Sequence, residues 1–189
     1  MTDSFFRTPR RALVAAIAAS LALAACGNGV GNSNADVIDA RVEATRAFLF
    51  DNFPGTRELA DEAEGILFIP LVTEAGLGVG GSYGRGALQI DGATVDYYSA
   101  TRATIGLQIG AQQFAHALFF MTPEALADFR TSDGWAVGAD VRYALPDQGG
   151  SIGVDTTTGR APVIAVVFGQ AGLLAGATLG GIKYTRIIP

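Results

Sequence analysis

Lysine, histidine, cysteine and tryptophan each occur only once in this sequence of 189 residues. A single cysteine, Cys26, excludes an intrachain disulfide. One histidine and one cysteine leave carboxylates as the other metal ligands, and the acidic residues are scattered along the chain. The sequence therefore predicts a protein without a metal site, and no motif calls for another cofactor.

Basic residues are also scarce. The chain has 13 lysines and arginines against 18 acidic residues, which gives a formal net charge of −5. Nucleic-acid binding depends on basic patches that neutralise phosphates, so we expect no nucleic-acid partner. The same deficit argues against general electrostatic attraction to an anionic membrane surface.

The amino-terminal segment has the composition of an export signal. Arg7, Arg10 and Arg11 precede an apolar run of small residues from Ala12 to Ala25. This run is too short to cross a bilayer as a helix, and its length is typical of a signal peptide. The arginine pair also loosely fits a twin-arginine signal, but Pro9 stands where a polar residue is usual, so the export route stays open.

The position of Cys26 predicts lipidation. It follows Leu-Ala-Ala at 23–25, an arrangement that resembles the bacterial lipobox. The resemblance implies a diacylglycerol thioether on Cys26, cleavage before it and acylation of the new amino terminus, which together anchor a protein in a membrane. Gly27 follows the cysteine and is not an acidic residue of the kind that retains a lipoprotein in the inner membrane. We therefore expect the protein to be anchored in the outer membrane of a bacterial cell envelope, facing the periplasm. The alternative is an ordinary signal peptide with an incidental cysteine.

The chain divides into three predicted parts. These are a lipoprotein signal peptide at 1–25, the lipidated cysteine with a flexible polar tether at 26–35, and one folded domain at 36–189. Loss of the first part removes one acidic residue and three arginines, so 10 basic and 17 acidic residues remain. The remaining 164 residues are enough for one domain with a substantial core.

Apolar periodicity predicts two helices ahead of a β-rich region. Residues 36–52 have helical spacing up to a Pro-Gly break, and Thr56 is placed to cap a second helix through residue 64. We expect both helices to cover a sheet; the alternative is that the first one touches a membrane. A third helix is predicted over Pro123–Arg130, with Thr122 as its cap.

From residue 65 onward, short apolar runs are broken by turn residues, which is typical of strands. Asp91-Gly92 predicts a hairpin turn. Pro70 is expected to end the first strand, and 146–160 is predicted to be a polar loop. The predicted strands cover residues 66–69, 75–81, 83–90, 94–98, 102–112, 115–121, 135–145, 162–169, 172–179 and 181–188. Their close succession favours an antiparallel sheet.

Many of the 25 glycines lie between residues 75 and 112, and several of them alternate with apolar residues. Glycine inside a strand costs stability and usually marks a bend or the close approach of another element. We therefore predict an α+β fold in which amino-terminal helices pack on a glycine-rich, strongly curved antiparallel sheet or small barrel.

Two motifs in this stretch point to activities that their context disfavours. Gly76–Gly81 fits the dinucleotide pattern G-x-G-x-x-G. Gly80–Gly84 fits the nucleophile elbow G-x-S-x-G around Ser82, and Asp91 or Asp96 and then His116 follow in the order of the α/β-hydrolase triad. Both need a helix directly after the turn, whereas the sequence returns to a strand at 87–90. We therefore expect no enzyme, and a serine hydrolase using Ser82 and His116 is kept as an alternative.

The order of the glycine-rich segments resembles the SYLF domain family, which includes bacterial lipoproteins and eukaryotic lipid-binding, actin-regulating proteins. The similarity covers residues 36–187, nearly all of the predicted mature chain. It rests on four segments in order: AEGILFIP at 63–70, EAGLGVGG at 74–81 with GRG at 84–86, IGLQIGAQ at 105–112, and GLLAG at 172–176.

The resemblance implies a lipid-binding module without catalysis. In eukaryotic relatives, phosphoinositide binding involves an amphipathic helix at the amino end of the domain, and here that helix carries Arg41 and Arg46. These two arginines and Arg85 are the candidate lipid-binding residues. The same helix carries four acidic residues, which argue against strong phosphoinositide binding: Asp36, Asp39, Glu43 and Asp51. Actin has no place in a periplasm, so actin binding is not expected.

The expected function is that of a non-enzymatic lipid-binding lipoprotein of the bacterial cell envelope. Its partner would be membrane lipid, through its own anchor on Cys26 and through a bound phospholipid. The alternative is a structural or protein-interaction lipoprotein with no lipid beyond that anchor.

Overall fold

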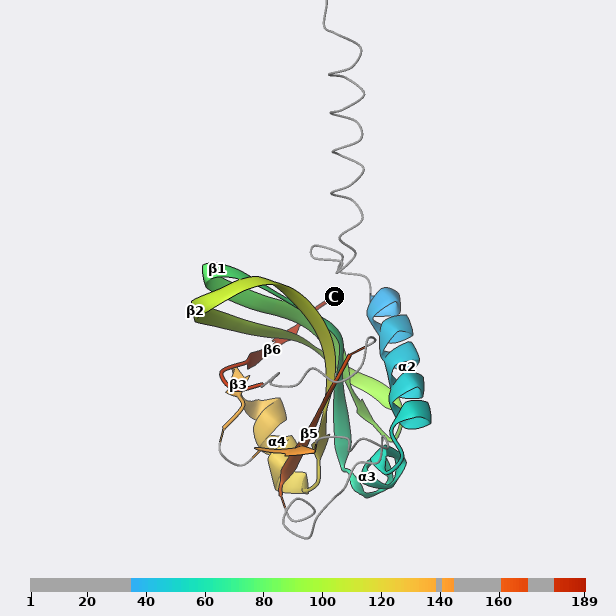
Figure 1. The fold of residues 1–189 in the computed structure, drawn as a ribbon. Coiled ribbons are helices and arrows are strands. Elements are labelled where there is room, and N and C mark those ends of the chain that lie inside the picture. Colours follow the sequence, from blue (N-terminus) through green and yellow to red (C-terminus); the bar gives the residue numbers. More distant parts are fainter. Residues whose placement is uncertain (1–34, 139–140, 145–160, 170–178) are drawn as a thin grey trace, which may run out of the picture. The chain divides into compact units, whose positions relative to one another are not determined.

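The computed structural model describes residues 35–138, 141–144, 161–169 and 179–189, which belong to a compact unit from Ser33 to Pro189. Two helices come first, and a third follows two long strands (Figure 1). The elements are, in order, α2 (Ala35–Asn52), α3 (Thr56–Glu62), β1 (Gly65–Ile90), β2 (Ala93–Phe120), α4 (Pro123–Thr131), β3 (Trp135–Ala136), β4 (Val141–Ala144), β5 (Val163–Phe168) and β6 (Lys183–Ile187).

The described strands form one six-stranded sheet around β2. The strand order is β3-β6-β2-β5-β4, and β1 pairs with β2 on its other side. At 26 and 28 residues, β1 and β2 are far longer than the usual 3–10. They pair from Gly65↔Phe120 to Ile90↔Ala93, with a register shift between Leu77 and Val79.

This long two-stranded ribbon curls so that its first half lies against its second half (Figure 1). A Cβ atom at Gly86 would lie 1.8 Å from the carbonyl oxygen of Phe68, and one at Gly84 would lie 2.8 Å from that of Leu71. Any larger residue would separate the two backbones, so these two positions need glycine. The predicted strong curvature is confirmed, and the element packed on the bare backbone is the same strand.

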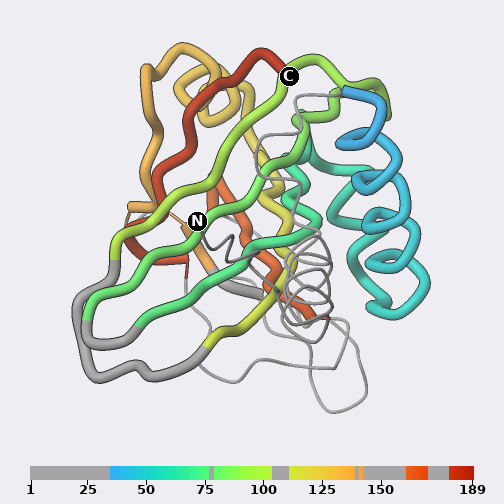
Figure 2. The backbone as a smooth tube through the Cα atoms, turned by 90° about the horizontal axis from the view of Figure 1, so that it is seen from above, coloured from blue at the N-terminus to red at the C-terminus, as the bar shows by residue number. Residues whose placement is uncertain are grey.

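The curled ribbon gives two layers. The first layer contains 65–76 of β1 and 110–120 of β2, extended by β5 and β4. The second contains 80–90 of β1 and 93–104 of β2, extended by β6 and β3. Seen from above, α2 and α3 lie on one side of the ribbon, and β6 and α4 lie on the other (Figure 2).

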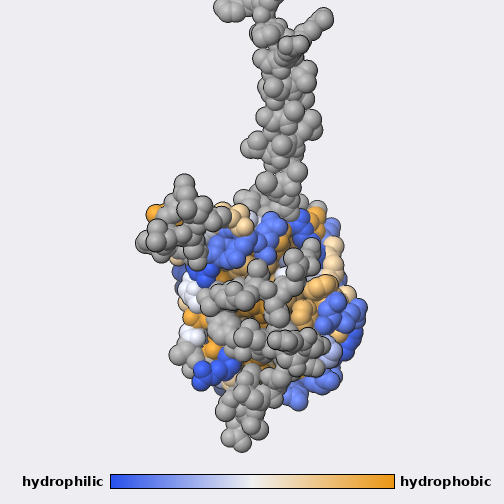
Figure 3. All heavy atoms as spheres, in the orientation of Figure 1, coloured by the Kyte–Doolittle hydropathy of each residue, from blue (hydrophilic) through white to orange (hydrophobic). Residues whose placement is uncertain are grey.

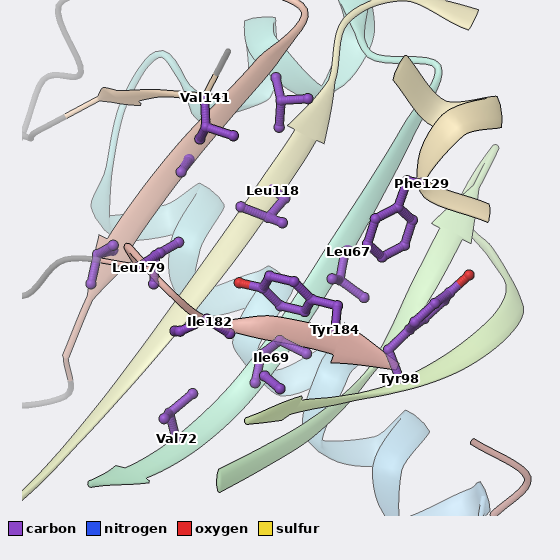
Figure 4. Close-up of a cluster of buried hydrophobic side chains, with 14 of the residues drawn as sticks. Leu67, Ile69, Val72, Tyr98, Leu118, Phe129, Val141, Leu179, Ile182 and Tyr184 are labelled. Atoms are coloured by element: carbon purple, nitrogen blue, oxygen red, sulfur yellow. The ribbon is translucent and has the colours of Figure 1, made fainter. Parts of the chain in front are cut away.

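Two buried clusters follow from the alternation of side chains along these strands. One lies between the layers, where Leu67, Ile69 and Leu118 meet Tyr98 and Tyr184 (Figure 4). Phe129 of α4 closes this interior, with ring centroids 4.6 Å from Tyr98 and 4.7 Å from Phe120. The other cluster joins the helices to the opposite strand faces and includes Ile38, Val42, Leu49, Leu59, Phe68, Phe119 and Phe168.

Polar contacts fix α2 on the ribbon. Asp39 accepts hydrogen bonds from Thr94 at 3.0 Å and from Tyr97 at 2.8 Å, and Gln89 donates to Glu43 at 2.8 Å. Burial and the bond to Asp39 raise the pKa of Tyr97 to about 12. Two acidic residues of α2 therefore form hydrogen bonds to the sheet. No helix in the described segments is both long enough and apolar enough to span a membrane.

The helix predictions are confirmed for α2 and α4, but the predicted cap of α3 is wrong. Thr122 accepts a hydrogen bond from the Ala125 amide at 3.2 Å, as expected. Thr56 instead donates to the carbonyl of Phe53 at 2.8 Å, and the cap of α3 is Gly55, with φ of 94° and no side-chain bond. The threonine therefore ties α3 back to the end of α2.

The strand predictions correctly identified the β-rich region but divided it too finely. The segments predicted between 66 and 90 are one strand, as are those between 94 and 120. Pro70 does not end β1, because it lies at a bulge between Ile69 and Val72 and β1 is paired on one side only. The hairpin turn is confirmed, with φ of 51° at Asp91 and 76° at Gly92.

The sheet is not wholly antiparallel, because β4 pairs with β5 in parallel. A parallel pair needs a long crossover, and the chain between these strands supplies 18 residues, from 145 to 162. The single strand predicted over 135–145 contains β3 and β4 as separate strands. The predicted loop at 146–160 and most of the predicted strand at 172–179 lie outside the described residues.

Candidate functional site

A cavity of about 670 Å³ lies between α2 and the first layer of the sheet. We call it the α2 groove. Helix α2 supplies one wall, and β1, β2 and the end of β5 supply the others. Its lining residues are Ala44, Thr45, Phe48, Pro70, Leu71, Gln113, Phe114, Ala115 and Phe168.

The β1 bulge forms the sheet side of this groove. Between Ile69 and Val72 the strand holds one more residue than β2 does between Phe114 and His116, so Pro70 and Leu71 interrupt the regular ladder. On the other side of the bulge, the Leu71 carbonyl faces Gly84 of the second layer. The close contact between Leu71 and Gly84 therefore supports this wall from the side opposite the groove.

Aromatic rings form part of the groove lining. Phe48 of α2 stacks on Phe168 of β5, with centroids 6.2 Å apart and planes inclined by 22°. Phe53 lies 5.9 Å from the Phe168 ring and 6.1 Å from the Phe48 ring. Such rings give a rigid apolar surface with little side-chain entropy to lose when a ligand binds.

None of the lining residues carries a charge. The polar ones are Thr45 and Gln113, and Gln113 donates a hydrogen bond to the Thr73 hydroxyl at 3.3 Å. A mostly apolar cavity with a few neutral polar groups is suited to an apolar ligand with a small polar part. On the face shown in Figure 3, the coloured residues form small hydrophobic areas separated by hydrophilic ones, without one continuous apolar patch.

A buried ion pair crosses the interior between the two layers. Both carboxylate oxygens of Glu74 accept from Arg102 Nη2 at 2.7 Å, and Gln112 donates to the same carboxylate at 3.0 Å. The side chains of Glu74 and Arg102 are 5% and 13% exposed. Because Glu74 belongs to the first layer and Arg102 to the second, the pair joins the layers near the bend of the ribbon.

The predicted lipid-binding arginines do not line the α2 groove. Arg41 and Arg46 both lie on α2, and their spacing places them about 140° apart around the helix. Arg46 pairs with Glu43 at 3.1 Å. Arg85 lies on β1, opposite Ser99 of β2. Arg41 and Arg46 therefore do not form one basic face. Cys26, the predicted lipid attachment site, lies outside the described residues.

The structure contradicts the Ser82–His116 hydrolase hypothesis. Ser82 is 6% exposed in the middle of β1, paired with Arg102 of β2, so it occupies no strand-to-helix turn. His116 is fully buried, and its Nε2 lies 2.7 Å from the Tyr184 hydroxyl. Burial lowers the pKa of His116 to about 3. Likewise, Gly76–Gly81 lies within β1, and no helix follows it before β2.

Sequence reasoning missed the α2 groove. The apolar pattern identified the helical face of Phe48, but the facing wall depends on a bulge and on strands that are distant in sequence. One local signal was present: a proline inside a strand pattern indicates an edge strand or a bulge, not only an end. In the described residues, no group of three histidine, cysteine or carboxylate side chains is placed to hold a metal ion.

Comparison with known families gives one match. Residues 101–186 match the family model Ysc84, described as "Las17-binding protein actin regulator". The matched segment begins within β2 and ends within β6, so it includes the Gln113–Ala115 and Phe168 walls of the α2 groove. A search of curated proteins found no significant match.

Proposed function

Residues 101–186 carry a domain of the Ysc84, or SYLF, family, and from this premise we propose that the chain is a non-enzymatic lipid-binding lipoprotein. The family is one of lipid-binding or actin-regulating proteins. The proposal places the lipid's apolar part in the α2 groove and holds the domain at a membrane of the bacterial cell envelope through acylated Cys26.

The observation that carries the lipid-binding part is the groove itself. It is uncharged, lined mainly by aliphatic and aromatic groups, and lies within the roughly 300–1,000 Å³ common for small-molecule sites. Burial of an acyl chain there removes apolar surface from water on both partners, at about 0.8 kcal/mol for each methylene group. The polar residues that line the groove are a threonine and a glutamine, so the lining includes no general base that could activate the threonine hydroxyl.

The anchor is supported by sequence. The apolar run at 12–25 ends directly before Cys26, and Gly27 follows it, a pattern that also supports location in the outer membrane, facing the periplasm. Arg41, Arg46 and Arg85 are each partly exposed and belong to the proposal as contacts for a lipid phosphate. The actin-related description of the matched family is not included, because it names no chemistry that the groove provides.

A flotation experiment tests this function. The chain from Gly27 to Pro189, which lacks the anchor, is mixed with vesicles of phosphatidylethanolamine and phosphatidylglycerol and centrifuged through a density gradient. The proposal predicts that protein rises with the vesicles. Failure to float with these vesicles, and with vesicles of phosphatidylcholine, would favour the alternative of a protein-interaction lipoprotein whose lipid is the anchor alone.

A further inference from the structure

We propose that the α2 groove takes one acyl chain of a single-chain lipid. This inference rests on the proposed lipid-binding function and adds the number of chains. Two properties of the described residues carry it: the volume of the groove and the chemistry of its walls.

The volume limits the number of chains. A methylene group occupies about as much space as a water molecule in the liquid, roughly 30 Å³. One chain of 16 to 18 carbons then needs about 480–540 Å³, and two need about 960–1,080 Å³. The groove has about 670 Å³. It therefore admits one chain of ordinary length, and a diacyl lipid would leave its second chain outside.

The walls explain why the chain enters here. Phe48 and Phe168 stack on each other in the lining, and Leu71, Phe114 and Ala115 continue the apolar lining along the sheet. The neutral polar residues Thr45 and Gln113 are half-buried and exposed, respectively, which places them toward solvent. They can hydrogen-bond to an ester or hydroxyl group at the top of a chain, but they do not neutralise an anion.

Two alanines on α2 provide matched variants. Ala44 lines the groove and is exposed, so Ala44→Trp fills the mouth without removing a core contact. Ala47 is exposed on the same helix and does not line the groove, so Ala47→Trp is the control. Gln113→Trp, on the opposite and exposed wall, is a second blocking variant in case Ala44→Trp lowers the helix content.

The experiment uses the full chain carrying Cys26→Ser, freed of lipid, so that its own anchor does not compete. The probes are palmitoyl lysophosphatidylcholine and palmitoyl lysophosphatidylglycerol, which share one chain and differ in net charge, each below its micelle-forming concentration. Native mass spectrometry measures the stoichiometry, and titration measures the affinity. Any binding to the amino-terminal apolar segment is common to all variants and cancels in the comparison.

We expect one lysolipid to bind in the groove of each chain, whichever head group it carries, because both probes have the same acyl chain. Ala44→Trp should lower the affinity on the order of tenfold, and Ala47→Trp should leave it within about twofold. Equal effects of the two variants, or loss of more than one bound lipid per chain in Ala44→Trp, would overturn the inference. Vesicle flotation without lysolipid binding would overturn this inference alone, and absence of both would overturn the proposed function as well.

Discussion

A single buried histidine makes the stability of the domain depend on pH. His116 lies in the interior with its Nε2 at the Tyr184 hydroxyl, and burial lowers its pKa from 6.5 to about 3. Between these two pH values His116 is protonated in the unfolded chain and neutral in the folded chain. The histidine's contribution is therefore complete above pH 6.5 and is lost progressively as the pH falls toward 3.

The corresponding variant is His116→Gln, which keeps a hydrogen-bonding group near Tyr184 and cannot take up a proton. In urea unfolding, the wild-type free energy should fall faster than that of the variant below pH 6.5, with the difference approaching about 1.4 kcal/mol per pH unit. The carboxylates titrate in both proteins and cancel in this difference. Parallel curves for the two proteins from pH 6.5 to pH 4 would contradict the assigned burial of the neutral ring.

At the scale of the element, the curl of the β1–β2 ribbon depends on glycine. An alanine Cβ at residue 86 would overlap the Phe68 carbonyl oxygen, whereas one at Gly138 would have no neighbour within 4 Å. Gly86→Ala should therefore lower the free energy of unfolding by about 3 kcal/mol or more, and Gly138→Ala should change it by less than about 0.5 kcal/mol. Chemical denaturation measures both, and similar losses for the two variants would be inconsistent with the close approach.

The elements also show where sequence analysis succeeds. Local signals determined α2, α4 and the Asp91-Gly92 turn, because helical periodicity, the Thr122 cap and positive φ each involve a few neighbouring residues. The glycine pattern predicted the curvature for the same reason. Features that depend on distant partners were missed: the continuity of β1 through Pro70, the parallel β4–β5 pair and the facing wall of the α2 groove.

At the scale of the whole molecule, the Glu74–Arg102 pair joins the two layers. Arg102→Met would leave the Glu74 carboxylate buried without its cation, and we expect a loss of about 3–5 kcal/mol in the free energy of unfolding. Replacing both residues, as in the double variant Glu74→Leu with Arg102→Met, removes the buried charge and should recover much of that loss. A double variant as unstable as Arg102→Met alone would show that the pair has no such coupling.

The layers and the helices together define the central claim, that a lipid chain occupies the groove between α2 and the first layer. Each wall comes from a separate part of the chain, with α2 on one side and the β1 bulge, Gln113–Ala115 of β2 and Phe168 of β5 on the other. A ligand in the groove must therefore contact segments more than 100 residues apart, such as those around Phe48 and Phe168. Contact with a flat surface of the domain would not require this combination.

Photolabelling tests this claim most directly. A lysophosphatidylcholine with a photoactivatable diazirine near the end of its acyl chain is bound and irradiated, and the labelled peptides are identified by mass spectrometry. Labels should appear in both the peptide containing Phe48 and the peptide containing Phe168, and Ala44→Trp should reduce both while Ala47→Trp leaves them unchanged. Labels confined to other parts of the domain, or unaffected by Ala44→Trp, would contradict a lipid chain in the α2 groove.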